Sequence, residues 1–510
     1  MNYETNTSTR ELHRVNRMIA ALSLLSALTA CSTAPVYTRP QLPAHAHFKE
    51  QSPLDKDVSA NWKIAEPGEN LHRGQWWKIF ADPGLDALEK EAIGANQSLK
   101  AAAARIQQSR ALTQGARAER FPSLEGGVGP TRQRVSPASQ SLPSDSEIQP
   151  QTLWRAQVTA SYELDLFGRV SSRIDAAEAD QEQNDALFRS IQLALQADVA
   201  QQYFRLRELD RQADLYRQTS VLREDTLRLI EHRFNEGETD EFDVARARNE
   251  AASARASAVG VARARAIAEH ALATLLGKIP ADFSLPETPL ESVSVQIPAG
   301  ISSTLLERRP DVAAAERAIA AANARIGVAK SAYFPKIDIT GAFGYESAKL
   351  KDLFNWSSRT FLLGPLVGTA LTVPIFDGGQ RNANLKGAQA RLDEAAANYQ
   401  QQVLVAFREV EDNLATLRLL RSQTAEQQVA LEASAKAEKL ARLRYREGQS
   451  NLIDLIDVQR QVLQSQLLVS DLVGARAIAT VNLIRALGGG WERNDNDDLT
   501  SAAVTERKNQ

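Results

Sequence analysis

Cysteine is nearly absent from this chain of 510 residues, which contains one cysteine, two methionines and six histidines. A single cysteine excludes a disulfide framework and any metal cluster built from several cysteines. An excess of charge of one sign is also lacking, because 60 lysines and arginines are interspersed among 63 aspartates and glutamates. The net charge of −3 gives no support to nucleic-acid binding, and the mixed charges indicate solvated helix faces.

Motifs that carry catalysis are missing as well. We find no nucleophile elbow, phosphate-binding loop or metalloprotease helix, and ARIGVAKSA (324–332) has a glycine and a lysine without phosphate-loop spacing. His45 and His47 have no third ligand nearby in the sequence, so we interpret them as solvated side chains. We therefore expect a protein that is not an enzyme and that holds neither a cofactor nor a metal ion.

Long hydrophobic runs are scarce, and the clearest apolar stretch is short and lies at the N-terminus. A basic lead-in (10–17) precedes the apolar run MIAALSLLSAL (18–28), which is too short to span a bilayer. The following Leu-Thr-Ala-Cys resembles a bacterial lipobox, in which the cysteine is acylated and becomes the mature N-terminus. We predict a signal peptide over 1–30 and a lipid on Cys31, in place of the alternative of a buried structural cysteine.

The residues after this cysteine extend the same interpretation. Ser32, in place of an aspartate, indicates by the same resemblance sorting to the outer membrane. Residues 31–70 are rich in proline and polar residues, and we expect an extended N-terminal segment leading from the anchor. No other stretch is expected to be apolar enough for a membrane helix, so any crossing of a membrane would use strands.

Proline is absent between Pro150 and Pro280 and after Pro374, which predicts long helices in both regions. A helix over 170–234 would be about 100 Å long at ~1.5 Å per residue. Its apolar residues follow heptad-like spacing, which favours coiled-coil packing over a globular core.

The chain also repeats itself. RFNEGETDEFDVARAR (233–248) matches RYREGQSNLIDLIDVQR (444–460). Three pairs of landmarks are each 211 positions apart: Gly237 and Gly448, Gly277 and Gly488, and Gly168 and Gly379. Phe121-Pro122 and Phe334-Pro335 are 213 apart, so an indel of two residues separates them from the rest. A common spacing at several anchors indicates a duplication.

The repeat gives a predicted domain order. The first repeat is 71–277, with strands at about 122–130 and 153–166 and long helices at about 169–234 and 239–276. A linker over 278–310 precedes the second repeat, 311–490, with strands at about 335–346 and 365–376 and long helices at about 379–446 and 452–487. A polar tail occupies 491–510.

The strands are long and regular. In WRAQVTASYELDLFGR (154–169), apolar and polar residues alternate for thirteen residues, which is the pattern of a strand with two different faces. This length fits the roughly 9–11 residues of a tilted strand in a membrane barrel. Four strands cannot close a barrel, and open edges in lipid leave backbone groups unpaired. A trimer would give twelve strands and a cylinder of twelve long helices.

Six segments together resemble the TolC/OprM-like outer membrane factor family, and in particular the NodT-type outer-membrane lipoproteins of RND-type efflux systems. They are WWKIFADPGLDALEKEAIGANQSLKAA (76–102), DLFGR (165–169), LERRPDVAAAE (306–316), AYFPKI (332–337), PIFDGGQR (374–381) and RYREG with its downstream DVQR (444–460). The resemblance implies an α-dominated membrane protein of the α+β class. It also implies a homotrimer whose 12-stranded outer-membrane β-barrel continues into a long periplasmic α-helical barrel.

The same resemblance implies a function and its partners. The chain would be the outer-membrane channel of a tripartite pump, closed at its periplasmic end at rest, in contact with outer-membrane lipid. A periplasmic adaptor would open it and an inner-membrane RND-type transporter would drive it, moving drugs or other toxic small molecules outward. Lipidation favours efflux over the first alternative, the channel of a type I protein-secretion system. The second alternative is a structural trimeric coiled-coil surface protein.

The resemblance also implies two sets of site residues. Adaptor contact is assigned to the helix-hairpin tips, whose matching residues are Arg233, Gly237, Arg444, Tyr445 and Gly448. The glycines also fit a purely structural role, because they supply the positive φ of a turn.

A pore-facing Leu-x-x-x-Asp-x-x-Arg pattern of the family corresponds to Ile453, Asp457 and Arg460, with isoleucine in place of leucine. These positions share one helix face, and in a trimer each would form a ring around the axis, closing the periplasmic end. The alternative is a surface ion pair between Asp457 and Arg460 with little energetic effect. The sequence leaves open whether Asp454, or Asp243 and Arg246 with Phe242 in the first repeat, take part.

Overall fold

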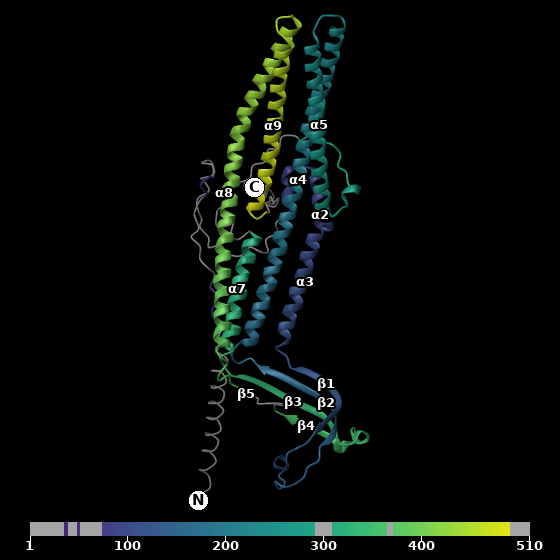
Figure 1. Ribbon diagram of the computed structural model, residues 1–510. Helices are drawn as coiled ribbons and strands as arrows, with labels where there is room; N and C mark the ends of the chain where they lie inside the picture. Colours follow the sequence, from purple (N-terminus) through teal and green to yellow (C-terminus); the bar gives the residue numbers. More distant parts are fainter. Residues whose placement is uncertain (1–34, 39–47, 51–73, 291–308, 365–370, 490–510) are drawn as a thin grey trace, which may run out of the picture. The chain divides into compact units, whose positions relative to one another are not determined.

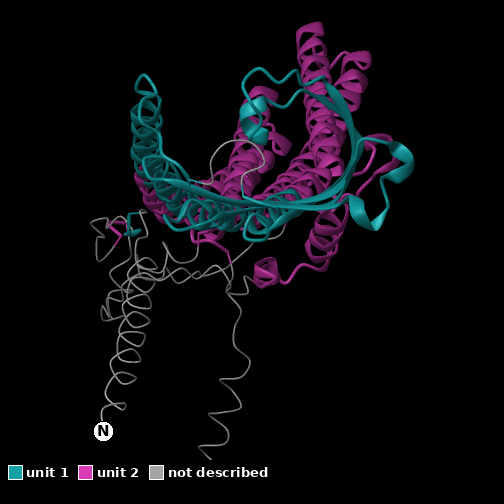
Figure 2. Cartoon of the chain, turned by 90° about the horizontal axis from the view of Figure 1, so that it is seen from below, with its two compact units in different colours: residues 1–40, 106–183, 315–399 teal, residues 41–105, 184–314, 400–510 magenta. Residues whose placement is uncertain are grey.

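Helices dominate the part of the chain that the computed structural model describes, which is residues 35–38, 48–50, 74–290, 309–364 and 371–489. The predicted signal peptide 1–30, Cys31, most of the segment 31–70 and the predicted tail 491–510 lie outside the described residues. The chain divides into two units (Figure 2): unit 1 is 1–40, 106–183 and 315–399, and unit 2 is 41–105, 184–314 and 400–510.

The helices vary widely in length (Figure 1). The longest are α4 (Arg169–Asn235) and α8 (Gln380–Arg446), with 67 residues each, and α5 (Glu241–Leu275) and α9 (Leu452–Ala486), with 35 each. Shorter helices are α2 (Pro83–Ala95), α3 (Gln97–Ala118) and α7 (Pro310–Ser331). Single 3-10 turns are η2 (Trp76–Phe80), η3 (Pro137–Gln140), η4 (Pro280–Asp282), η5 (Leu350–Asp352) and η6 (Trp356–Ser358).

Unit 1 contains an antiparallel sheet in the order β1-β2-β3-β4, labelled in Figure 1, with β5 also paired to β3. The strands are β1 (Ser123–Gln133), β2 (Gln151–Leu164), β3 (Lys336–Ser347), β4 (Arg359–Leu363) and β5 (Leu371–Thr372). The register places Val158 opposite both Gly126 and Phe343, and Phe343 opposite Phe361.

This register separates two chemically different faces of the sheet. Opposed residues share a face, so one face carries the exposed apolar side chains Leu124, Val128, Val158, Ile339, Phe343, Phe361 and Leu363. On the other face Arg155 Nε donates to Glu346 Oε2 at 2.6 Å. An exposed apolar face opposite a charged face is unusual for a sheet that packs against a water-soluble core.

The predicted fourth strand, 365–376, agrees with the structure in part, and its residues 365–370 lie outside the described residues. The observed β4 covers Arg359–Leu363, ahead of the predicted range, and within that range Leu371–Thr372 forms a strand among the described residues. Arg359 and Thr360 looked like loop residues because they are polar, but they pair with Tyr345 and Gly344. Pro374 has no N–H to donate, so pairing beyond Thr372 is disfavoured.

The turn from β2 to α4 explains why the strand changes into a helix at this point. Gly168 has a φ of +72°, which favours glycine. Asp165 then accepts hydrogen bonds from the backbone N–H groups of Val170 (2.9 Å) and Ser171 (2.8 Å), so it satisfies two donors at the start of α4. Gly379, before α8, has a φ of +94°.

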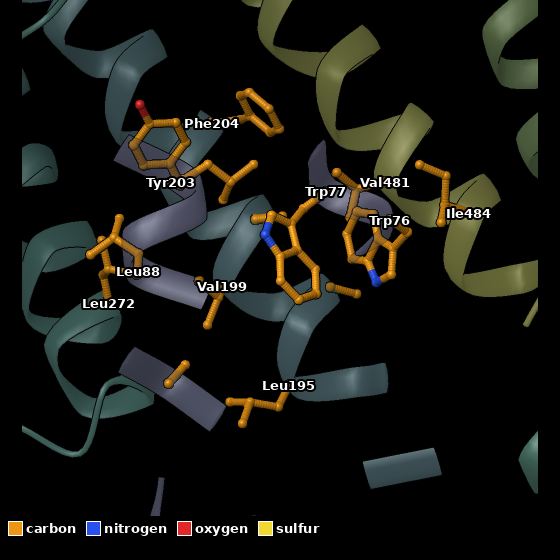
Figure 3. Packing of buried hydrophobic residues seen from close by; sticks show 14 of the residues in the cluster. Trp76, Trp77, Leu88, Leu195, Val199, Tyr203, Phe204, Leu272, Val481 and Ile484 are labelled. Atoms are coloured by element: carbon orange, nitrogen blue, oxygen red, sulfur yellow. The ribbon is translucent and has the colours of Figure 1, made fainter. Parts of the chain in front are cut away.

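Unit 2 has the main apolar cluster, which joins α2, η2, α4, α5 and α9 (Figure 3). Trp76 and Trp77 are buried in it with their rings edge to face, and Trp76 Nε1 donates to Gln196 Oε1 at 3.1 Å. Phe204, Leu272 and Ile484 are fully or almost fully buried in the same cluster. The short N-terminal elements are therefore fixed against three of the long helices.

We expected no further stretch to be apolar enough for a membrane helix, and this expectation was wrong when helices are judged by length and composition. Among the described residues, α9 is the one helix that is long and apolar enough to span a bilayer by those two criteria. Half of its most apolar 18-residue window is buried inside the chain. A helix packed in the interior of a protein has the same property.

Candidate functional site

Two helix hairpins of unit 2 end in turns of the same construction. After α4, Gly237 has a φ of +74°, and Glu238 N donates to Arg233 O at 2.8 Å. After α8, Gly448 has a φ of +70°, and Gln449 N donates to Arg444 O at 2.8 Å. Nothing lies within 4 Å of an added Cβ at either glycine, so it is the backbone conformation that requires glycine.

The helices that follow the turns are capped by acidic residues. Asp240 Oδ1 accepts from Asp243 N at 3.0 Å, and Thr239 Oγ1 donates to Asp243 Oδ2 at 2.7 Å. At α9, Asn451 N donates to Asp454 Oδ2 at 3.4 Å in a capping box. Asp454, whose role the sequence left open, thus takes part in capping α9, while the carboxylate of Asp243 is bonded by Thr239 in the turn before α5.

The two tips contact each other. Arg233 Nη1 donates to Tyr445 Oη at 3.2 Å, and the guanidinium lies 5.8 Å from the centre of the Tyr445 ring. An apolar cluster below them joins both hairpins through Ile230, Val244, Ala247, Leu452 and Ile456. Arg444 is exposed, and Arg246 lies 5.9 Å from the Phe242 ring centre at the start of α5.

The three candidate gate residues lie on the first turns of α9. Ile453 is half-buried, while the side chains of Asp457 and Arg460 are 56% and 51% exposed. Arg460 Nη1 donates to Asp457 Oδ1 at 3.1 Å, so the ion pair within one chain, which was the alternative to the gate, is present. A carboxylate and a guanidinium at this exposure remain available to a neighbouring molecule.

Arg460 has a second and more buried partner that the sequence analysis missed. Its Nε donates to Glu250 Oε2 on α5 at 3.2 Å, and its Nη2 bonds the other oxygen of the same carboxylate. Glu250 is buried. The hydrogen bond to Glu250 raises the pKa of Arg460 above its usual value.

Arg223 on α4 completes this group. It is 3% exposed, and its Nη1 donates to Gln459 Oε1 at 2.8 Å on α9. Its Nε lies 3.8 Å from Glu250 Oε2. Burial lowers the pKa of Arg223 from the usual arginine value. Glu250 is therefore shared by two guanidinium groups, one on each hairpin.

The sequence contained a signal for these two residues. Glu250 follows the buried positions Val244 and Ala247 along α5 at helical spacing, and Arg223 lies four and seven residues before Leu227 and Ile230 of the tip cluster. A charged residue on an apolar helix face is costly unless it is paired, so such positions point to a buried partner. The identity of the partner depends on the contact between the hairpins.

The chemistry available here is electrostatic. Among the residues with described positions, no group of three or more histidines, cysteines, aspartates or glutamates is arranged to hold a metal ion. The site combines an exposed carboxylate, two arginines and two glycine turns at the same ends of the hairpins. This arrangement can bind another protein surface or control the passage of charged solutes.

A family model described as outer membrane efflux protein matches the chain twice, over residues 88–278 and 301–489. The chain is 36% identical to the outer membrane protein OprJ of Pseudomonas aeruginosa over 93% of its own length and 96% of that protein. It is 34% identical to the solvent efflux pump outer membrane protein SrpC of Pseudomonas putida, over 92% of this chain and 97% of SrpC.

A solved structure is similar as well. The open state of the Neisseria gonorrhoeae MtrE outer membrane channel superposes with a TM-score of 0.76 at 30% identity, covering 91% of this chain and 99% of MtrE.

Proposed function

Because the chain belongs to the outer membrane efflux protein family, we propose that it is the outer-membrane channel of a tripartite efflux pump. In this proposal it conducts drugs or other toxic small molecules from the periplasm to the exterior. A periplasmic adaptor opens it, and an inner-membrane RND-type transporter supplies the energy. The observation that carries the proposal is the sheet with an exposed apolar face opposite a charged face.

The sheet supports a location in lipid and a closed assembly. Its apolar face suits hydrocarbon, and its charged face suits a water-filled lumen. The order β1-β2-β3-β4 leaves two open edges, and unpaired backbone groups in lipid cost several kcal/mol each, in order of magnitude. Three copies would join these edges into a 12-stranded barrel above a long α-helical barrel. Trp154 and Tyr162 would lie at its lipid interfaces.

We propose that the chain is internally duplicated. Arg169 and Gln380, the first residues of α4 and α8, are 211 positions apart, as are Glu241 and Leu452, the first residues of α5 and α9. The paired helices have equal lengths, and the family model matches each half separately. A duplicated hairpin explains why both tips use the same glycine turn.

The hairpin tips are the proposed contact with the adaptor. Arg233, Gly237, Arg444, Tyr445 and Gly448 form two similar turns with exposed basic side chains. Rings of Ile453, Asp457 and Arg460 around the trimer axis are the proposed gate. The exposure of Asp457 and Arg460 supports this role, because residues sealed inside one chain cannot form a ring with neighbours.

Asp457→Ala tests the gate. We expect larger single-channel conductance in planar bilayers and greater sensitivity of cells to a large glycopeptide antibiotic, because a ring of carboxylates held by arginines is lost. Asp214→Ala, which removes a half-buried carboxylate paired with Arg217 on α4, is the matched control. Unchanged conductance in a correctly assembled Asp457→Ala trimer would refute the gate.

Lipidation at Cys31 is a separate prediction. Cells grown with a labelled fatty acid should incorporate the label into the wild-type protein, whereas Cys31→Ser should lose the label and migrate as the unprocessed precursor. The channel itself is expected to assemble in either case. Labelling that persists in Cys31→Ser would exclude Cys31 as the site.

A further inference from the structure

Glu208 is a buried carboxyl group on the face of α4 that packs against α9, and it is 2% exposed. Two donors on its own helix bond the same oxygen. Arg205 Nη1 donates to Glu208 Oε1 at 2.7 Å, and Gln212 Nε2 donates to it at 3.0 Å. The side chain is thus fixed in one orientation, toward α9.

On α9 the space for this carboxyl group is provided by Gly474. A Cβ at position 474 would lie 2.4 Å from Glu208 Oε2, which is closer than such atoms approach. One turn earlier on α9, Asp471 Oδ1 accepts from the same Gln212 Nε2 at 2.6 Å. Gln212 Nε2 therefore bridges the two carboxyl groups, because it donates both to Glu208 Oε1 at 3.0 Å and to Asp471 Oδ1 at 2.6 Å.

The electrostatics place the ionisation of this group near neutrality. Burial is the largest cause that raises the pKa of Glu208, to about 7, and Asp471 raises it further while Arg205 opposes the rise. Arg205 on α4 and Asp471 on α9 are the charged groups facing Glu208. In an opened contact, water would replace α9 and Asp471 while Arg205 stays beside Glu208 on α4, and the pKa of Glu208 would return toward 4.5.

We propose that Glu208 and Asp471 form a proton-dependent contact between the two hairpins of the chain. With the proton present, Glu208 donates a hydrogen bond to Asp471 and the helices pack at the close distance that Gly474 permits. When the proton leaves, two carboxylates face each other across the contact and favour separation of α4 from α9. The ligand of this site is therefore the proton. The packing of the two hairpins would depend on the pH around the outer membrane.

The direction of the effect follows from the two ionisation states. Below about pH 4.5 Glu208 is protonated in both the closed and the opened contact, so pH has no effect there. Between about pH 4.5 and 7 only the closed contact keeps the proton, so rising pH favours opening. From pH 5 to pH 8 the opened fraction should rise on the order of 70-fold.

Amide hydrogen exchange of the full-length protein in detergent tests this directly. At each pH from 5 to 8, the α9 peptide containing Asp471 and Gly474 is compared between the wild type and Glu208→Gln, so that the intrinsic pH dependence of exchange cancels. The glutamine keeps a donor toward Asp471 and cannot ionise. We expect the protection of the wild type, relative to that of Glu208→Gln, to weaken roughly 70-fold between pH 5 and pH 8.

Two further variants keep the test decisive. Glu224→Gln removes an exposed ion pair with Arg255 inside the first hairpin and should follow the wild type. Asp471→Asn removes one of the two facing carboxylates, so the pH at which protection weakens should be lower than in the wild type. This variant also tests the proposal if Glu208→Gln fails to fold. The proposal would be overturned if the ratio of protection between the wild type and Glu208→Gln stayed constant from pH 5 to pH 8. It would also be overturned if the pH at which protection weakens were the same in Asp471→Asn as in the wild type. Exchange is independent of conductance, so either result leaves the proposed channel function and gate untouched.

Discussion

The free energy of unfolding is expected to fall as the pH rises from about 4.5 toward about 9, and Glu89→Leu is expected to remove most of this fall. Glu89 on α2 is fully buried, and neither of its carboxyl oxygens has a hydrogen-bond partner among the described residues. Burial raises the pKa of Glu89 from 4.5 to about 9. The side chain is therefore a neutral acid at pH 7.

The sign follows from proton uptake. Between the two pKa values the unfolded chain has lost the proton of Glu89 while the folded chain retains it, so unfolding releases a proton and becomes easier as the pH rises. The slope is about 1.4 kcal/mol per pH unit, and the whole interval corresponds to on the order of 6 kcal/mol. Glu208 adds a similar slope up to about pH 7, but it is common to the wild type and the Glu89 variants.

Melting temperatures at pH 5, 7 and 9, measured by circular dichroism in detergent, check this prediction. Glu89→Leu should exceed the wild type most at pH 9, because an apolar side chain replaces a buried carboxyl group. Glu89→Gln should lose the part of the pH slope that Glu89 contributes and keep the cost of a buried polar group. Glu91 lies on α2 like Glu89 and forms an exposed ion pair with Lys278. Glu91→Gln breaks this pair and should keep the wild-type slope. Parallel curves for the wild type and Glu89→Leu would contradict the assignment.

The long helices were predictable because the residues that end them are close to those ends in the sequence. Glycines with positive φ at 168, 237 and 448 mark turns that the repeat makes visible in the sequence. The predicted long helices differ from α4, α5, α8 and α9 by at most two residues at any end. Proline-free stretches with helical periodicity leave few alternatives to a helix.

Strand β4 at Arg359–Leu363 was not predicted, because the position of a strand depends on its pairing partners. Arg359 and Thr360 are polar, and they adopt a strand because they pair with Tyr345 and Gly344 on β3. The apolar run after them suggested the later start. A short edge strand has too few residues for its own periodicity to fix its register.

The candidate site was predictable only in part for the same reason. The tips and Asp457 follow from the repeat and the resemblance, whereas the partners of Glu250 and Arg223 are recognisable only once α9 contacts α5 and α4. Glu89 gives no signal beyond being a charged residue between Leu85, Leu88 and Ala92. Which buried charges remain unpaired is a property of tertiary packing.

Glu250→Ala is expected to loosen the hairpin tips as strongly as Asp457→Ala. Arg460 is held to α5 through both oxygens of a buried carboxylate, but to Asp457 through one exposed hydrogen bond. Removal of the carboxylate leaves Arg223 buried without its nearest counter-charge, a change that costs about 3–5 kcal/mol in comparable buried pairs. Single-channel conductance should rise, and the melting temperature should drop.

A loss of folding must be separated from a loss of gating. Glu231→Ala removes an exposed partner of Arg248 within the first hairpin and should change neither quantity, because surface pairs contribute about 0–1 kcal/mol. In the double variant Arg223→Leu/Glu250→Leu, apolar residues replace the buried charges, and the melting temperature should recover. Arg460 still lacks its anchor there, so conductance should stay high. If conductance returned to the wild-type value together with the melting temperature, Glu250 would act through packing alone and not by holding Arg460 at the gate.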